Sequence, residues 1–97
     1  MVYEWDAAKA AKNWRKHRVS FAEAASVFLD PFALTFDDPD HSQEEHREIT
    51  IGFSSKQRAL FVSHCMRGER MRIISARKAD GEEIEQYAEK IKDIRPE

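Results

Sequence analysis

The lysines, arginines and histidines of this chain are its best candidates for anion binding and proton transfer. Residues 56–78 hold seven lysines or arginines (at 56, 58, 67, 70, 72, 77 and 78) and one acid, although the whole chain has a net charge of −2. Four of these cations, Arg67, Arg72, Arg77 and Lys78, fall on an expected turn, a strand and its exit into a helix. A local excess of cations in an acidic chain is typical of a site for a polyanion, most commonly a nucleic acid.

These side chains match the needs of RNA cleavage without a metal ion. In that reaction a base takes the proton of the 2′-hydroxyl, an acid protonates the departing 5′ oxygen, and fixed cations hold the charge that gathers on phosphorus. His17 and His64 are candidates for the proton transfers, because histidine ordinarily titrates near neutral pH. Arg67, Arg72 and Arg77 are candidates for charge stabilisation. Structural alternatives stay open: core packing for His64, and ion pairs with acids for the arginines.

A second basic block lies near the N-terminus, where residues 9–18 carry five bases and no acid. Lys9, Asn13, Lys16 and His17 recur at the spacing of one helix face. We expect Lys9, Asn13 and Lys16 to position RNA together with Lys78. A solvated helix surface is the alternative for the lysines, and it explains Asn13 less well because asparagine is a poor mid-helix residue.

Few other kinds of site are expected. Tyr87 offers a hydroxyl or a ring for base stacking, although its helical spacing fits core packing equally well. The four histidines and Cys65 lack paired ligand spacing, except for His41 and His46 in an acidic loop, so we expect no metal and no cofactor. The sequence contains no Gly-rich phosphate loop and no serine nucleophile elbow.

Composition indicates one globular domain, residues 1–97, in the cytoplasm. Hydrophobic residues make up 41% of the chain and charged residues 35%, a balance typical of globular rather than disordered proteins. The single cysteine excludes an internal disulfide and suits a reducing compartment. No apolar run approaches the ~20 residues of a membrane span, and the first residues lack a secretory pattern.

The N-terminal part of the chain predicts a short strand followed by two helices. Met1–Trp5 is expected to be the strand, and Asp6 is a good N-cap for a helix that runs to about His17. The pattern Ser20-x-x-Glu23 is a capping box for a second helix, which ends before Asp30-Pro31. A further strand over Phe32–Asp37 and a loop over Asp37–Gln43 complete this part.

The remaining sequence changes to a period of two, which indicates strands. Arg47–Phe53, Ala59–Met66 and Met71–Arg77 alternate in this way and are joined by short polar connections, so they are expected to form an antiparallel meander. Strict alternation places Arg72 and Arg77 on opposite faces, unless a bulge intervenes. Asp80-x-x-Glu83 caps a last, amphipathic helix. The predicted fold class is α+β: an antiparallel sheet packed against two N-terminal helices and closed by a C-terminal helix.

Taken together, these residues resemble the BrnT family of type II toxins over nearly the whole chain. The matching elements are Trp5-Asp6-x-x-Lys9-x-x-x-Asn13-x-x-Lys16-His17, Phe21-x-x-Ala24-x-x-Val27-Phe28-x-Asp30-Pro31, Arg47 with Ile51-Gly52, Arg67-Gly68, and Arg72-Ile73-Ile74-Ser75-Ala76-Arg77-Lys78-Ala79, followed by Glu83 and Tyr87. One departure is Arg18, where the family usually has a glycine. Glycine forms a left-handed helix C-cap at little cost, whereas arginine costs roughly 1 kcal/mol more in that conformation.

The resemblance implies a RelE-like ribonuclease fold and an endoribonuclease that cleaves RNA and so halts translation. It also implies neutralisation by a cognate antitoxin with a ribbon-helix-helix DNA-binding half. The toxin would be a homodimer in that complex, which would repress its own operon. DNA would then be contacted only through the antitoxin, and no membrane would be involved.

Two hypotheses of different classes follow. In the first, the chain is a toxin endoribonuclease that uses the arginines and histidines named above. In the second, it is a non-catalytic partner-binding module whose basic face docks the antitoxin for transcriptional autoregulation. Cations that converge on an open concave groove would favour cleavage, whereas cations that are scattered or paired with carboxylates would favour binding alone. A DNA-binding protein is disfavoured by the net charge and by the lack of a recognisable helix-turn-helix.

Overall fold

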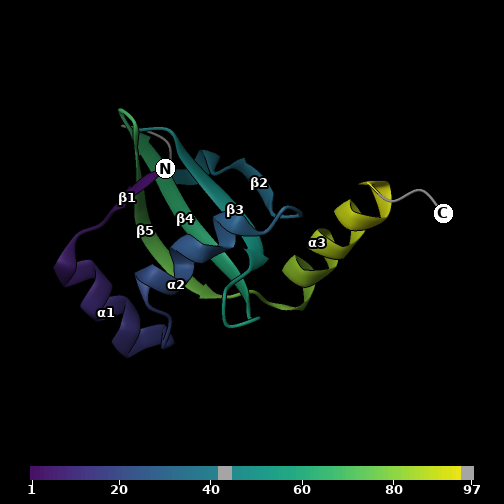
Figure 1. Cartoon of the computed structure of the whole chain (residues 1–97), viewed down its shortest axis with the longest axis horizontal. Coiled ribbons are helices and arrows are strands. Elements are labelled where there is room, and N and C mark those ends of the chain that lie inside the picture. Colours follow the sequence, from purple (N-terminus) through teal and green to yellow (C-terminus); the bar gives the residue numbers. More distant parts are fainter. Residues whose placement is uncertain (42–44, 95–97) are drawn as a thin grey trace.

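A computed structural model describes residues 1–41 and 45–94 of the chain and confirms the predicted α+β class (Figure 1). In chain order the elements are β1 (Val2–Glu4), α1 (Ala7–His17), α2 (Phe21–Ala25), the 3-10 turn η1 (Ser26–Leu29), β2 (Leu34–Asp37), the 3-10 turn η2 (Pro39–His41), β3 (Arg47–Phe53), β4 (Ala59–Arg67), β5 (Arg70–Lys78) and α3 (Gly81–Ile94). The second predicted helix is therefore split into α2 and η1. The predicted loop contains η2, and its last residues, 42 and 43, lie outside the described residues.

The helices begin where their capping residues predicted. The carboxylate of Asp6 accepts the Lys9 N–H at 2.9 Å and starts α1. Asp80 and Glu83 form a reciprocal capping box at α3, in which each carboxylate accepts the backbone N–H of the other residue at 2.8–2.9 Å. Ser20 caps α2 through the Glu23 N–H, at 3.0 Å. None of the helices in the described ranges is long and apolar enough to cross a bilayer.

The five strands form one mixed sheet in the order β1-β5-β4-β3-β2. The predicted antiparallel meander is confirmed for β3 to β5. The strand β2 extends it beyond β3, and β1 adds a parallel edge strand beside β5 that the antiparallel prediction missed. This edge is short, because β1 pairs only with residues 70–72 of β5. The outer edge of β5 beyond Arg72 is therefore left for another element to cover.

A β-bulge in β5 changes which way its later side chains point. Ser63 of β4 pairs with Ser75, but the next residue, His64, pairs with Ile73, so β5 has one extra residue at Ile74. The partners of Arg72 and Arg77 on β4 are Cys65 and Phe61, which are four residues apart and share one face. The strictly alternating prediction is thus wrong for this strand, and the bulge brings both arginines to the same face.

The two faces of the sheet carry separate cores. On the inner face, Leu60, Val62 and Ile73 pack against residues that include Phe21 and Val27 of α2 and η1. On the outer face, which also carries Arg72 and Arg77, Ile49 and Ile51 of β3 pack with Tyr87 of α3, and Phe61 and Ile91 lie against them. Figure 1 shows α1 and α2 beside the sheet while α3 extends away from it past the end of β5. The outer face is therefore only partly covered.

Candidate active site

Asn13 fixes helix α1 against the uncovered edge of β5. Its amide nitrogen donates to the carbonyl oxygens of Val19, at 2.9 Å, and Ala76, at 2.8 Å, and its side-chain oxygen accepts the Ala76 N–H at 3.1 Å. The residue is only 7% exposed. These bonds explain an asparagine in mid-helix, because they position α1 against β5. Asn13 also lines a hollow, and its RNA contact stays a prediction.

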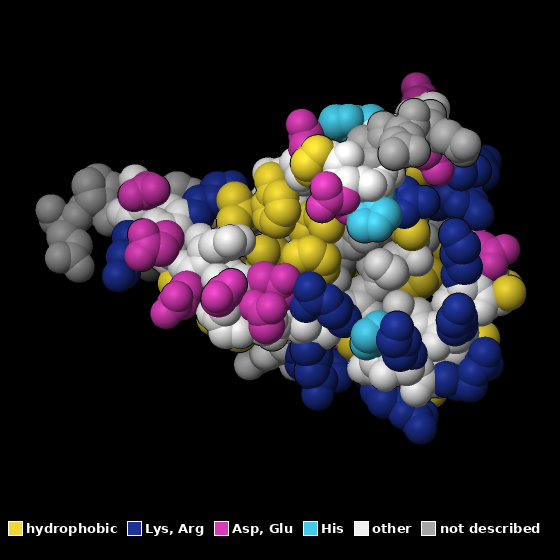
Figure 2. Space-filling view, turned by 180° about the vertical axis from the view of Figure 1, so that it is seen from behind, with side chains coloured by type: hydrophobic (Ala, Val, Ile, Leu, Met, Phe, Trp, Pro, Cys, Tyr) yellow, Lys and Arg dark blue, Asp and Glu magenta, His cyan; other side chains and the backbone are white. Residues whose placement is uncertain are grey.

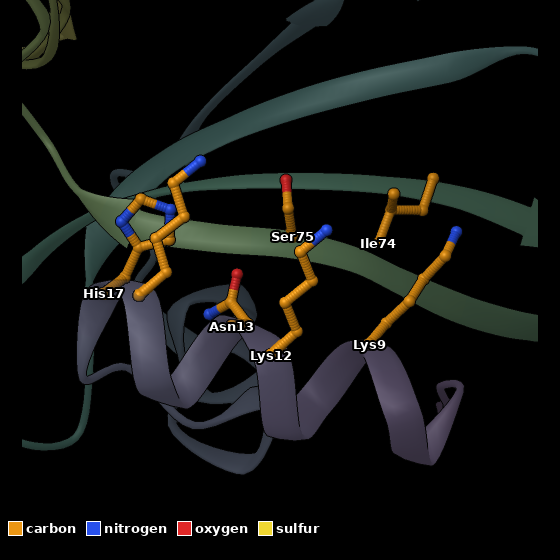
Figure 3. A pocket seen from close by; sticks show the side chains of 7 residues that line it. Lys9, Lys12, Asn13, His17, Ile74 and Ser75 are labelled. Atoms are coloured by element: carbon orange, nitrogen blue, oxygen red, sulfur yellow. The ribbon is translucent and has the colours of Figure 1, made fainter.

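The basic face of α1 lines a hollow against the bulge of β5 (Figure 3). The hollow has a volume of about 180 Å³, and its walls are Lys9, Lys12, Asn13, Lys16, His17, Ile74 and Ser75. Across residues 1–41 and 45–94, the three lysine ammonium groups have no ion-pair partner. Lys12 was not among the residues predicted to position RNA, although its spacing of three and four residues from Lys9 and Lys16 places it on the same helix face.

A second hollow of about 180 Å³ adjoins the first on the outer face of the sheet. It is lined by Asp38, His41, Arg47, Ile49, Phe61, Ser63, Ile74 and Ser75. Ile74 and Ser75, at the bulge, line both hollows, so the basic face of α1 lies on one side of these two residues and Asp38, His41 and Arg47 lie on the other. Figure 2 looks onto this face, where lysines and arginines gather over the α1 side and acids gather over α3.

None of the three arginines predicted as charge stabilisers lines either hollow, and each is paired with a carboxylate. Arg67 bonds Glu45 at 3.1 Å, and Arg72 bonds Glu4 at 2.7 Å. Arg77 makes two parallel bonds of 2.8 Å to Glu83, which raise the pKa of its guanidinium, and it lies 4.0 Å from the centre of the Phe61 ring. Because Phe61 lines the second hollow, Arg77 stands at the margin of that hollow.

His64 is part of the inner core and is not placed for proton transfer to RNA. It is 1% exposed, its Nε2 is 2.7 Å from the Thr50 hydroxyl, and the ring of Phe28 packs edge-on at 4.8 Å between centroids. Burial lowers the pKa of His64 to about 4, so the ring is neutral near pH 7. The catalytic prediction for His64 is therefore wrong, and the core-packing alternative holds.

Tyr87 is likewise a packing residue. It is 8% exposed, its ring meets Phe53 at 5.4 Å between centroids, and its hydroxyl donates to Asp30 at 2.8 Å. Burial and the Asp30 carboxylate raise the pKa of Tyr87 to about 12. A base cannot stack on this enclosed ring, which corrects the predicted RNA contact. Lys78 is exposed at the end of β5 and lines neither hollow, and its RNA contact stays a prediction.

Comparison with known proteins places the chain in a family. A family model described as a ribonuclease toxin, BrnT, of type II toxin-antitoxin systems matches residues 5–83. The chain belongs to the BrnT family. The crystal structure of the Brucella abortus ribonuclease toxin BrnT is similar in fold, with a TM-score of 0.66 and 26% sequence identity over 82% of this chain and 99% of that one. Among curated protein sequences, none matches significantly. As a toxin of a type II toxin-antitoxin system, this BrnT family protein has an antitoxin as its partner.

Arg18 keeps the backbone conformation for which the BrnT family glycine was expected. Its φ and ψ are 56° and 35°, in the left-handed region, and its N–H closes α1 on the Trp14 carbonyl at 2.9 Å. The guanidinium lies 5.6 Å from the centre of the Trp14 ring, a cation–π contact that offsets part of the backbone strain. The helix therefore ends as it would with glycine, and His17 remains on the wall of the first hollow.

One group of possible metal ligands occurs within residues 1–41 and 45–94. Ligand atoms of Asp37, His46 and Glu48 lie within 4.8 Å of one another at the β2–β3 edge. Asp37 and His46 are exposed, and none of the three lines either hollow. Exposed groups of this kind are common without an ion, so this group carries no argument about the reaction.

Proposed function

We propose that this BrnT family protein is an endoribonuclease that cuts single-stranded RNA without a metal ion where the two hollows meet. The observation that carries the proposal is the convergence of Lys9, Lys12, Lys16 and His17 on the bulge at Ile74–Ser75. Within residues 1–41 and 45–94 the three lysines have no carboxylate partner, so no ion pair there must be broken before they neutralise phosphates. Arg47, on the wall of the second hollow, extends the positive surface along the path of the chain.

The paired arginines support this site in two different ways. Exposed ion pairs contribute at most about 1 kcal/mol, so Arg67 can exchange Glu45 for an RNA phosphate at little cost. The Arg77–Glu83 pair is more enclosed and bidentate, and it joins the end of β5 to the start of α3. The paired charges largely cancel, so Arg77 then supports the site by joining β5 to α3 and by holding Phe61, rather than as an unpaired phosphate ligand.

The test is cleavage of a labelled single-stranded RNA by the purified chain in the presence of a chelator. The wild-type chain is expected to cut, leaving a 2′,3′-cyclic phosphate and a 5′-hydroxyl. A variant with Lys9→Ala, Lys12→Ala and Lys16→Ala is expected to bind RNA with a salt slope reduced by about 2, because each phosphate contact to a single strand contributes about 0.7. Arg15→Ala is the matched control, since Arg15 lies on the same helix but lines neither hollow.

Comparison of the two variants shows whether RNA binds at the hollow or only to the positive charge of α1. The triple-lysine variant removes three charges and Arg15→Ala removes one, so a loss in Arg15→Ala of about one third of the triple-lysine loss would mean that only total charge matters, and the hollow would have no special part. If wild-type chain free of antitoxin cuts none of several RNAs, the nuclease proposal fails. Alanine favours helix, so α1 is expected to stay folded in both variants, which circular dichroism checks.

The consequences of this activity in the cell follow from the BrnT family membership. We propose that cutting of messenger RNA halts translation and that the antitoxin carries a ribbon-helix-helix DNA-binding half. The toxin would be a homodimer in the complex, and the complex would repress its own operon in the cytoplasm. Induction of the chain should then stop incorporation of labelled amino acids, and co-expression of the neighbouring antitoxin gene should restore it. Continued translation with abundant soluble toxin would contradict this proposal.

A partner-binding module without catalysis is the second candidate, and one observation favours it. All three predicted charge-stabilising arginines are paired with carboxylates, as expected for a surface that does not meet phosphate. In that case the triple-lysine variant would lose affinity for the antitoxin, and the wild-type chain would not cut RNA. Measuring antitoxin affinity and RNA cleavage on the same two proteins separates the candidates.

A further inference from the structure

His41 stands on the wall of the second hollow, across the bulge from His17. It is the last residue of η2 and lines the hollow together with Arg47 and Ser63. His17 lines the first hollow, at the end of α1. Because Ile74 and Ser75 line both hollows, the two imidazoles stand on opposite sides of these two residues. Neither the sequence motifs nor the family description draws attention to His41.

Asp38 fixes how the His41 ring presents its nitrogens. The Oδ2 atom of Asp38 lies 3.1 Å from Nδ1 of His41, and a carboxylate can only accept, so Nδ1–H donates. The Asp38 side chain is 14% exposed and the His41 side chain 64% exposed, so the carboxylate is the buried partner and the ring is the one that faces solvent. The Asp38 N–H also donates to the Arg47 carbonyl at 2.9 Å, which joins the start of this turn to β3. The proton-free nitrogen, Nε2, is then the one left to act as a base.

We propose that His41, positioned by Asp38, is the general base of the RNA cleavage and that His17 is the general acid. This inference rests on the proposed ribonuclease function. His41 Nε2 takes the proton of the 2′-hydroxyl as O2′ forms a bond to phosphorus. The bond from phosphorus to O5′ breaks, and His17 gives its proton to O5′. The products are a 2′,3′-cyclic phosphate and a 5′-hydroxyl, so protons and bonds balance.

The charges that face His41 suit this reaction. On its own segment the facing acid is Asp38, and from β3 the facing cation is Arg47. The lining residues from β4 and β5, Phe61, Ser63, Ile74 and Ser75, are all uncharged. Across the bulge stand Lys9, Lys12 and Lys16. A phosphodiester at the bulge would therefore lie between cations on both walls, with one imidazole on each side.

The chain contains a matched control for this arrangement. His46 also pairs with an aspartate, Asp37, at 2.9 Å, and both side chains are exposed. Neither residue lines a hollow. Replacement of His46 thus removes an aspartate-paired histidine that is as exposed as His41, at 65% against 64%, without changing a residue that lines either hollow.

The experiment measures cleavage of a labelled RNA against pH, with chelator present, by full-length wild type and variants. Wild type is expected to show a bell-shaped profile. His41→Gln should cut at least about 100-fold more slowly at pH 7 and lose the acidic limb, because that limb reports a base that must be deprotonated. His17→Gln should lose the alkaline limb instead. Asp38→Asn should slow cutting about tenfold, and His46→Gln should stay within about twofold of wild type.

Binding and folding are read on the same samples. RNA affinity of His41→Gln should stay within about threefold of wild type, because a base that acts in the transition state contributes little to ground-state binding. Imidazole in solution should restore part of the activity of His41→Ala. Equal unfolding midpoints would show that the exposed His41 is not needed for folding.

Each outcome decides a different question. If wild type cuts RNA and His41→Gln keeps both limbs and the wild-type rate, the inference about His41 is wrong while the proposed function stands. An equal loss in His46→Gln and His41→Gln would also overturn the inference. If wild type cuts no RNA at any pH, the proposed function itself fails and the assignment of His41 fails with it.

Discussion

Replacement of Asn13 distinguishes a positioning function from an RNA contact. Asn13→Ala removes three hydrogen bonds and leaves the N–H and C=O of Ala76 and the C=O of Val19 buried without their partner. Each lost bond costs about 1 kcal/mol, and more where the remaining group stays buried, so the expected loss is about 3 kcal/mol. Alanine is a better helix former than asparagine by about 0.6 kcal/mol, which lowers the net loss to roughly 2–3 kcal/mol.

Urea and thermal unfolding of the purified chain, followed by circular dichroism, measure this loss. For a chain of this size about 4–8 °C of melting temperature corresponds to each kcal/mol, so Asn13→Ala should melt roughly 10–20 °C below wild type. Asn13→Asp should be less stable still, because a carboxylate would face two carbonyl oxygens without a proton to donate. Lys12→Ala is the control, since Lys12 is the exposed neighbour on the same helix.

A small change in stability would refute this reasoning. If Asn13→Ala unfolds within about 0.5 kcal/mol of wild type, the three bonds contribute little and α1 is held by other contacts. If, in addition, RNA affinity falls sharply in that folded variant, Asn13 contacts RNA as the sequence first suggested. The unfolding data and the binding data together therefore choose between the two functions.

Three further predictions concern pH, the helix C-cap and a buried ion pair. Burial lowers the pKa of His64 to about 4, so between about pH 6.5 and pH 4 the unfolded chain binds a proton at His64 and the folded chain does not. The free energy of unfolding should then fall by about 3 kcal/mol from pH 6.5 to pH 4, and the fall should be smaller in His64→Gln, as measured by urea titrations at each pH. Arg18→Gly should raise stability by about 0.5 kcal/mol, because relief of left-handed strain of about 1 kcal/mol exceeds the lost Trp14 contact, and a lower melting temperature would contradict this. Arg58→Ala should cost about 3 kcal/mol in urea unfolding, because Arg58 pairs with Glu23, whose buried carboxylate would be left without its main partner. A loss below about 1 kcal/mol would mean that Glu23 becomes protonated or hydrated instead.

Local signals in the sequence predicted most of the elements. Asp6, Ser20 and Asp80 mark helix starts because their side chains satisfy backbone N–H groups a few residues away, and such short-range bonds can be read directly from spacing. The alternation of apolar and polar residues predicted β3, β4 and β5, because it too can be read from neighbouring positions in the sequence. The parallel position of β1 could not be read in this way, because pairing of Tyr3 with Met71 depends on the whole fold.

The candidate site was predicted in part. The helix face with Lys9, Lys16 and His17 follows from periodicity alone, and the structure places these residues together. The partners of the arginines were not predictable, because Glu4, Glu45 and Glu83 come from three separate parts of the chain. His41 was passed over because the sequence showed only an acidic loop, whereas the pairing of β2 with β3 brings its turn to the sheet face.

The single extra residue in β5 determines how this strand tolerates insertions and deletions. Before the bulge, Met71 and Ile73 point into the inner core; after it, Ala76 does, so the inward positions change from odd to even numbers at Ile74. Loss of one residue there would exchange the two faces for the rest of the strand and turn the Arg77 guanidinium toward Leu60 and Val62. Insertions or deletions between Ile73 and Ala76 are therefore far more disruptive than substitutions at the same positions, and the length of this segment is itself a functional property of the strand.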